Sequence, residues 1–325
     1  MIQIFRVRGI PVRIDVGWLL VFGLISWSLA SGYFPYVLPA QSAAAYWAQG
    51  LLAAALLFSS VLLHELAHAL VAIGHGVPVG GITLHVFGGV SQLEGEPETP
   101  RAEILIAIVG PFTSFAIAGI AAIVGRVLSG PAWAEALTGY LAAVNLLVGF
   151  FNLLPAFPLD GGRVLRAALW RWSGRLDWAS RVASRIGSFF GLLMVAAGIA
   201  RAIAGEAMGG LWLALIGLFL HQAARASYEV VRLRERLEPL PVERVMNVAP
   251  AALDAARAAT LTGIPGAVVS PRDSAWQAFL KISRNGLGRV AVIDGGMLVG
   301  VVSQRDLQHA VNDAGTTGDV ARRAA

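Results

Sequence analysis

The sequence contains no cysteine and few charged residues. Without cysteine the chain can form no disulfide and offers no thiolate to a metal ion, so any metal site must use histidine and carboxylate side chains. Only 14% of the residues are charged, against about 25% in an ordinary soluble domain, while 56% are hydrophobic and the mean hydropathy is +0.67. This balance is typical of a membrane protein.

The basic residues indicate which partners to expect. They number 25 against 20 acidic residues, but they are bunched beside apolar stretches instead of forming one continuous surface. We therefore interpret them as anchors to a lipid bilayer and expect no nucleic-acid partner. The N-terminal segment, Met1 to Asp15, has no small-residue cleavage site after its first apolar run, so we expect no removed signal peptide.

Six apolar runs are long enough to cross a bilayer, which takes about 20 mostly apolar residues. They are Val16 to Tyr33, Trp47 to Ile73, Ile104 to Leu128, Ala136 to Leu154, Ile186 to Ala204 and Gly209 to Ser227. The sequence therefore predicts a polytopic α-helical membrane protein with about six transmembrane helices.

Arginine is concentrated in alternate connections between these runs. The N-terminal arm, the loop after the fourth run and the exit from the sixth run are rich in arginine, whereas the connection from Phe34 to Tyr46 has no charge. Because Lys and Arg near the ends of spans stay on the cytoplasmic side, we expect a multi-pass protein of the cell membrane with both termini in the cytoplasm.

Two stretches near the membrane lack a helical pattern. Val77 to Glu94 combines glycine turns with the β-forming run Ile82 to Phe87, which predicts a membrane-associated strand or hairpin. Pro155 to Gly162 contains two prolines and two glycines and ends the fourth span. Because unpaired backbone is not tolerated in lipid, each stretch must lie at the interface, be buried in protein or line a water-filled cavity.

The composition changes near Leu237 to that of a small soluble α/β domain. Alternating hydrophobic runs predict three short strands, at Ala267 to Val269, Arg289 to Ile293 and Leu298 to Val302. A helix is expected between Ala275 and Ser283. We therefore predict a transmembrane domain over residues 1–236 and a soluble domain over residues 237–325.

The second apolar run contains the pattern His-Glu-x-x-His, formed by His64, Glu65 and His68. Two histidines four residues apart lie on one helix face, roughly 6 Å apart, where they can share a zinc ion. Glu65 can then act as general base on the water beside the metal. The pattern alone also arises by chance, but ionisable residues inside an apolar span are costly to bury unless they are paired or bound to a metal.

A catalytic zinc ion needs a third protein ligand and an open position for water. Asp160, at the cytoplasmic end of the fourth span, is the candidate, because the Pro/Gly break lets the backbone turn this carboxylate back into the bundle. The alternative is an interfacial aspartate that caps the next helix.

Together the two motifs resemble the site-2 protease family of intramembrane metalloproteases. In that family His-Glu-x-x-His on one transmembrane helix is joined by Asn-x-x-Pro-x-x-Pro-Leu-Asp-Gly on a later one, and the second pattern stands here from Asn152 to Gly161. The resemblance covers roughly residues 1–230.

The resemblance implies a role for each motif residue. It implies that His64, His68 and Asp160 bind Zn²⁺, that Glu65 is the base, and that Asn152 lies near the active site and holds the substrate or the oxyanion. The segment around Gly88 and Gly89 resembles the family's membrane-embedded β region, whose edge pairs with an unwound substrate strand.

The tail resembles a cystathionine-β-synthase (CBS) domain, through Arg244-Val245-Met246 at its start and Gly300-x-x-Ser303-x-x-Asp306-Leu307 at its end. Such domains commonly pair and bind adenine nucleotides, so the resemblance implies that Ser303 and Asp306 contact the ribose and phosphate of ATP or another adenine nucleotide. Only one repeat is present, and Pro250 to Pro265 is longer and more Ala-rich than the usual linker. We therefore expect a homo-oligomer; the alternative is a dimerisation module with an empty nucleotide site.

These observations predict an intramembrane zinc endopeptidase with a cytoplasmic regulatory domain, acting on a membrane-bound or membrane-associated protein. The family resemblance suggests a sigma-factor precursor or a membrane-held signalling protein as substrate. One alternative is a nucleotide-responsive membrane sensor or scaffold without proteolytic activity. Another is a zinc transporter, which would need an acidic or His-lined path through several spans, and the other spans show no such series.

Overall fold

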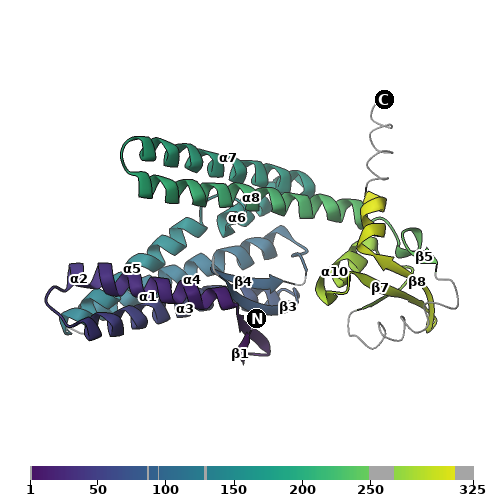
Figure 1. Ribbon diagram of the computed structural model, residues 1–325. Coiled ribbons are helices and arrows are strands. Elements are labelled where there is room, and N and C mark those ends of the chain that lie inside the picture. Colours follow the sequence, from purple (N-terminus) through teal and green to yellow (C-terminus); the bar gives the residue numbers. More distant parts are fainter. Residues whose placement is uncertain (1, 86–87, 94, 128–129, 249–266, 312–325) are drawn as a thin grey trace. The chain divides into compact units, whose positions relative to one another are not determined.

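The computed structural model describes residues 2–85, 88–93, 95–127, 130–248 and 267–311 (Figure 1). The chain divides into two compact units, Met1–Arg225 and Ala226–Ala325. The division falls within the long helix α8 (Ala207–Leu237), which also contains the domain boundary expected after residue 236. The whole Ala-rich segment, residues 250–265, lies outside the described residues.

Six helices of the described chain are long and apolar enough to cross a membrane. They are the helical segment Val16–Val37, which contains α1 (Val16–Ser28) and α2 (Phe34–Val37), and then α3 (Ala43–Gly74), α4 (Pro100–Val127), α5 (Ala132–Asn152), α7 (Leu176–Ile203) and α8. The predicted polytopic helical fold with six spans is confirmed. α7 begins before the predicted Ile186 and α8 continues past Ser227, because a hydropathy run measures the apolar part of a helix and not its full length.

A four-stranded sheet packs beside α3 in the order β1-β2-β3-β4. Strands β3 (Val79–His85) and β4 (Gly88–Leu93) form the antiparallel hairpin that the glycine-rich stretch predicted. Strands β1 (Ile2–Val7) and β2 (Ile10–Ile14) form a second hairpin that the sequence reasoning missed.

The missed hairpin is joined to the sheet by a non-local contact. β2 pairs with β3 in parallel, so that Val12 lies opposite Ile82. The alternation of basic and apolar residues near the N-terminus has the period of a strand. The sequence analysis treats this segment only as a basic N-terminal arm, because no local pattern indicates that its partner strand lies so far along the chain.

A sharp break separates α5 from α6 (Asp160–Ser173). The stretch predicted to be non-helical ends earlier than expected, since Asp160, Gly161 and Gly162 already belong to the first turn of α6. The two glycines let this turn approach the preceding backbone, and a Cβ atom on Gly162 would lie 2.6 Å from the carbonyl carbon of Ala156. The break therefore places Asp160 at the start of a helix that packs tightly against its own connection.

Helices α7 and α8 lie side by side through two pairs of glycines (Figure 1). Gly191 meets Gly217, and Gly198 meets Gly210, so that a Cβ atom on Gly198 would lie 2.5 Å from the carbonyl oxygen of Gly210. Small residues allow helix backbones to approach closely in lipid, where no hydrophobic force drives helices together. Between these helices, Nδ1 of His221 in α8 lies 2.8 Å from the Ser188 hydroxyl of α7.

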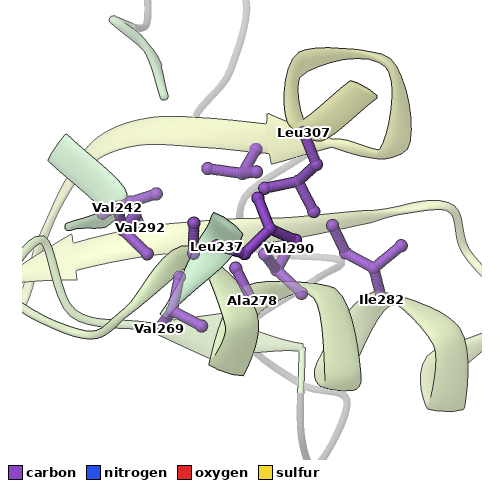
Figure 2. Close-up of a cluster of buried hydrophobic side chains, with 10 residues drawn as sticks. Leu237, Val242, Val269, Ala278, Ile282, Val290, Val292 and Leu307 are labelled. Carbon is purple, nitrogen blue, oxygen red and sulfur yellow. The ribbon is translucent and has the colours of Figure 1, made fainter. Parts of the chain in front are cut away.

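The second unit is a small α/β domain, as predicted. Its sheet has the order β5-β8-β7-β6, with β5 (Asn247–Val248), β8 (Met297–Ser303), β7 (Arg289–Asp294) and β6 (Val268–Val269). Helix α10 (Ala275–Asn285) corresponds to the expected helix. Figure 2 shows Val290 of β7 near Leu307 and Ile282 of α10 in the buried core, with Val292 nearer to Val242.

Replacing Gly198 by valine should separate α7 from α8. Inserting a side chain into this backbone contact should destabilise the protein by about 1–3 kcal/mol, as overpacking does. The measurement is the thermal unfolding midpoint of the detergent-solubilised protein. Gly119→Val in α4 is the control, because no heavy atom lies within 4 Å of its Cβ position. Equal losses in the two variants would contradict the importance of the glycine pair.

Candidate metal centre

Two histidines of α3 face the interior of the first unit. His64 and His68 are each only 4% exposed, and their ring centroids are 4.8 Å apart. Residues four apart share a face of an α-helix, which explains why both imidazoles point the same way. The four-residue spacing of the two histidines therefore places both imidazoles on one face of α3, as predicted.

Asp160 reaches these histidines from the first turn of α6. Its Oδ2 atom lies 3.2 Å from Nε2 of His64 and 3.2 Å from Nε2 of His68. Asp160 does begin the next helix, as the alternative interpretation held, but its carboxylate also points into the bundle. It lies outside the six spans, where burial alone would raise its pKa; the two imidazoles beside it prevail and lower the pKa to about 2. The carboxyl is therefore ionised at neutral pH, as a metal ligand must be.

Helix α4 orients both imidazole rings from behind. Nδ1 of His64 lies 2.9 Å from the Ser114 hydroxyl, and Nδ1 of His68 lies 2.5 Å from the carbonyl oxygen of Ile106. A carbonyl oxygen can only accept, so His68 donates through Nδ1, and the neutral ring then presents a lone pair at Nε2. That lone pair faces a carboxylate oxygen of Asp160, which is also an acceptor. A cation between the two atoms would satisfy both.

The geometry of the three side chains fits a zinc ion. Their donor atoms all lie within 4.8 Å of one another. Ligand atoms about 2.0–2.2 Å from a tetrahedral zinc ion are roughly 3.3 Å from each other, close to the observed 3.2 Å between the carboxylate and each imidazole. Two histidines and one carboxylate also leave a fourth position open, as catalytic zinc sites do.

Gly110 of α4 keeps the space beside the imidazoles open. A Cβ atom at this position would lie 2.6 Å from Nε2 of His64 and closer still to Nε2 of His68. Any side chain here would therefore occupy the place where the two ring nitrogens converge. The requirement for glycine is steric, because α4 approaches α3 at this point.

Glu65 is held by strand β4 of the sheet. The Ser91 hydroxyl lies 2.8 Å from Oε2 of Glu65, and the Ser91 backbone N–H donates to the same oxygen at 3.1 Å. Gly89 allows this approach, since a Cβ atom on it would lie 3.1 Å from the Glu65 carboxyl carbon and closer still to Cγ. The sheet thus fixes the carboxylate that follows the first histidine of the motif.

The residues predicted to hold substrate lie at two places. The Asn152 side chain, at the end of α5, donates to the carbonyl oxygen of Val148 at 3.0 Å, within its own helix. Gly88 and Gly89 lie opposite His85 and Leu84 in the β3–β4 pairing. Within the described sheet, β4 has a hydrogen-bonded neighbour on one side only, so its outer edge is unpaired. A role in substrate binding stays a prediction for all three residues.

Ser303 and Asp306 lie together at the end of β8 in the second unit. Oδ2 of Asp306 accepts from the Ser303 backbone N–H at 2.8 Å and from its hydroxyl at 2.6 Å. This contact is typical of a helix start, and residues 304–311 are helical. Both residues also line a cavity of about 560 Å³ together with Asn247, Arg289 and Arg305. Nucleotide binding stays a prediction.

Comparisons with known proteins agree with both parts of the chain. The model of peptidase family M50 matches residues 52–139 and 131–195, and the model of the CBS domain matches residues 264–313. The chain is 40% identical over 252 residues to the candidate zinc metalloprotease Rip3 of Mycobacterium tuberculosis, a match that covers 77% of this chain and 64% of that protein. The chain therefore spans less than two thirds of the length of this relative.

Two further matches come from Methanocaldococcus jannaschii. A zinc metalloprotease of this organism is 31% identical over 249 residues, covering 77% of this chain and 67% of the relative. A solved site-2 protease from the same organism has 31% identity and a TM-score of 0.47, covering 70% of this chain and 94% of that one. The family models and the 31% identical zinc metalloprotease show that the protein belongs to peptidase family M50, the site-2 proteases, and carries a CBS domain after its membrane helices.

Several residues around the centre escaped the sequence reasoning. Ser91, Gly110 and Ser114 are small residues in or beside membrane segments, where serine and glycine are common, so they gave no distinctive signal. Ile106 contributes a backbone carbonyl, which no side-chain pattern can reveal. Only their closeness to the motif in space identifies them.

Ser114→Ala should weaken metal binding while leaving the fold intact. The substitution removes the hydroxyl that orients His64, and loss of such an outer partner typically lowers metal affinity by about 10–100-fold. Zinc affinity can be measured by competition with a chromophoric chelator. Ser59→Ala is the matched control, because the exposed Ser59 hydroxyl donates to the Ala55 carbonyl of its own helix. An unchanged zinc affinity in Ser114→Ala would show that the contact does not position His64.

Proposed function

We propose that this protein is an intramembrane zinc endopeptidase. One observation carries the proposal: inside a bundle of membrane helices, Nε2 of His64 and Nε2 of His68 both lie 3.2 Å from one carboxylate oxygen of Asp160, while Nδ1 of His68 is bonded to a backbone carbonyl. Membership of peptidase family M50 supports the same activity. In this proposal His64, His68 and Asp160 hold Zn²⁺.

Glu65 is the general base of the proposed reaction. Zinc, when bound, supplies a Lewis acid that polarises a carbonyl and makes water a better nucleophile at neutral pH. Glu65 takes the proton of the attacking water and then passes it to the leaving amine. Ser91 keeps the Glu65 carboxylate in place through the two contacts to Oε2. The scissile peptide bond gains the elements of water, and an acid and an amine are released.

The substrate in this proposal is a membrane-bound or membrane-associated protein. A helical substrate hides its carbonyl groups in its own hydrogen bonds, so it must be extended before hydrolysis. The outer edge of β4, with Gly88 and Gly89, offers backbone groups that replace those bonds. Asn152 contacts the extended substrate or the oxyanion. A sigma-factor precursor or another membrane-held regulator is the kind of substrate that such cleavage would release.

The CBS domain is the proposed regulatory part. The arginine distribution supports a cell-membrane protein with both termini in the cytoplasm, a transmembrane domain over residues 1–236 and a cytoplasmic domain over residues 237–325. A single repeat favours pairing with a second copy of the chain. The cavity lined by Ser303, Asp306 and Arg289 supports binding of ATP or another adenine nucleotide, because a guanidinium beside hydroxyl and carboxylate groups suits phosphate and ribose.

Glu65→Gln should abolish cleavage without removing zinc. The amide keeps the shape of the side chain but cannot accept the proton, so turnover should fall by about 10²–10⁴-fold. Purified, zinc-loaded variant and wild-type proteins are compared on candidate membrane substrates, which are found as proteins that accumulate uncut in membranes of Glu65→Gln cells. A metal chelator should stop the wild-type reaction. Equal cleavage by both proteins would refute the mechanism, and the absence of any substrate would favour the sensor or scaffold.

Gly89→Ala should slow cleavage by displacing Glu65. A Cβ atom at Gly89 collides with the Glu65 side chain, and a misplacement of about 1 Å can cost about 10²-fold in rate. The zinc content should stay at the wild-type level, because the metal ligands are untouched. Gly139→Ala in α5 is the control, since no heavy atom lies within 4 Å of its Cβ position. Wild-type turnover in Gly89→Ala would disprove the steric role of the glycine.

A further inference from the structure

One face of α4 supports the two histidines of the proposed metal centre. Ile106, Gly110 and Ser114 are the residues that bond to or pack against the imidazoles. They follow Glu103 at intervals of three, seven and eleven residues, which is the repeat of a single helix face. Glu103 therefore belongs to the same face, one turn before the carbonyl that fixes His68.

Glu103 forms a buried ion pair with Arg166 of α6. Nε of Arg166 donates to Oε1 of Glu103 at 2.6 Å, and a second guanidinium nitrogen lies 2.5 Å from the same oxygen. Glu103 is fully buried and Arg166 is 6% exposed. Arg166 belongs to the arginine-rich stretch after the fourth predicted span, and its side chain is buried inside the first unit.

Arg166 also holds the connection that leads into α6. Its guanidinium carbon lies 5.2 Å from the centre of the Phe157 ring, which belongs to the Pro/Gly-rich break before Asp160. A second carboxylate, Glu96, lies 3.6 Å from the guanidinium. One side chain thus joins α4, α6 and the segment between α5 and α6.

The chemistry of the pair suits positioning better than stabilisation. Burying two charges is costly, and an apolar pair of similar volume often stabilises a protein as well or better. Two hydrogen bonds from a planar guanidinium to a carboxylate, however, restrict the distance and orientation of the two helices more narrowly than an apolar contact does. A precise separation of α4 and α6 matters here, because α4 orients the histidines while α6 carries the aspartate.

We propose that Glu103 and Arg166 are a positioning pair for Asp160, holding α6 where its first residue meets the two histidines that α4 orients. The inference rests on the proposed metal site. Neither residue touches the reacting atoms; both act through the placement of Asp160. The pair thereby links the third ligand to the same helix face that fixes the first two.

The test replaces the pair by apolar residues and measures metal binding by the full-length protein. Glu103→Leu with Arg166→Met removes both charges of the buried pair together, so the double variant should fold. Its zinc affinity, measured by competition with a chelator, should fall by about 10–100-fold, and the visible absorption of bound Co²⁺ should change because the carboxylate ligand is displaced. Arg166→Lys alone keeps the charge but loses the planar guanidinium, and should show a smaller loss of affinity.

The control applies the same substitutions to an exposed pair. Arg201→Met in the last turn of α7, with Glu206→Leu in the connection to α8, should leave zinc affinity and the Co²⁺ spectrum unchanged. Wild-type zinc affinity in the folded Glu103→Leu/Arg166→Met protein would overturn the inference. If the double variant fails to fold, the Arg166→Lys variant provides the test. Wild-type zinc affinity in Arg166→Lys would then also overturn the inference. Wild-type protein that binds no zinc would instead refute the proposed function itself.

Discussion

The need to pair buried ionisable groups organises the membrane unit. Charged and titratable side chains among apolar helices are costly unless each finds a partner or a metal. His64 and His68 converge on Asp160, Glu65 is held by Ser91, and Glu103 is bonded to Arg166. These contacts join segments that are distant in the sequence, so the polar groups that carry the proposed chemistry also determine where α4, α6 and the sheet lie around α3.

Helix α4 is the common support of this arrangement. It contributes a hydroxyl from Ser114, a carbonyl from Ile106 and an open space at Gly110, each at the point where α3 presents an imidazole. Glycine recurs wherever two backbones or a backbone and a functional side chain must touch, as at Gly89 beside Glu65 and at Gly198 between α7 and α8. Close approach, rather than conformational freedom, explains these glycines.

Much of the fold and of the candidate centre was predictable from local patterns. Hydropathy located all six spans, since each must match the thickness of a bilayer. The four-residue spacing of His64 and His68 placed both on one helix face, and the Pro/Gly break marked where Asp160 turns back. Helix α6 was missed because its arginines resemble a charged loop, and the β1–β2 hairpin was missed because its partner strand lies far along the chain.

The sequence by itself determined the membrane topology class, the candidate metal ligands and the CBS domain, because these depend on composition and on spacing within short segments. Only the tertiary structure decided that Nε2 of His68 meets Asp160 while its Nδ1 meets the Ile106 carbonyl, that Ser91 holds Glu65, and that Arg166 is buried against Glu103. Those contacts use a backbone carbonyl, a common hydroxyl and an arginine typical of a loop. These contacts are recognised only because the residues lie close together in the folded protein, and the spacing of residues along the chain does not reveal that closeness.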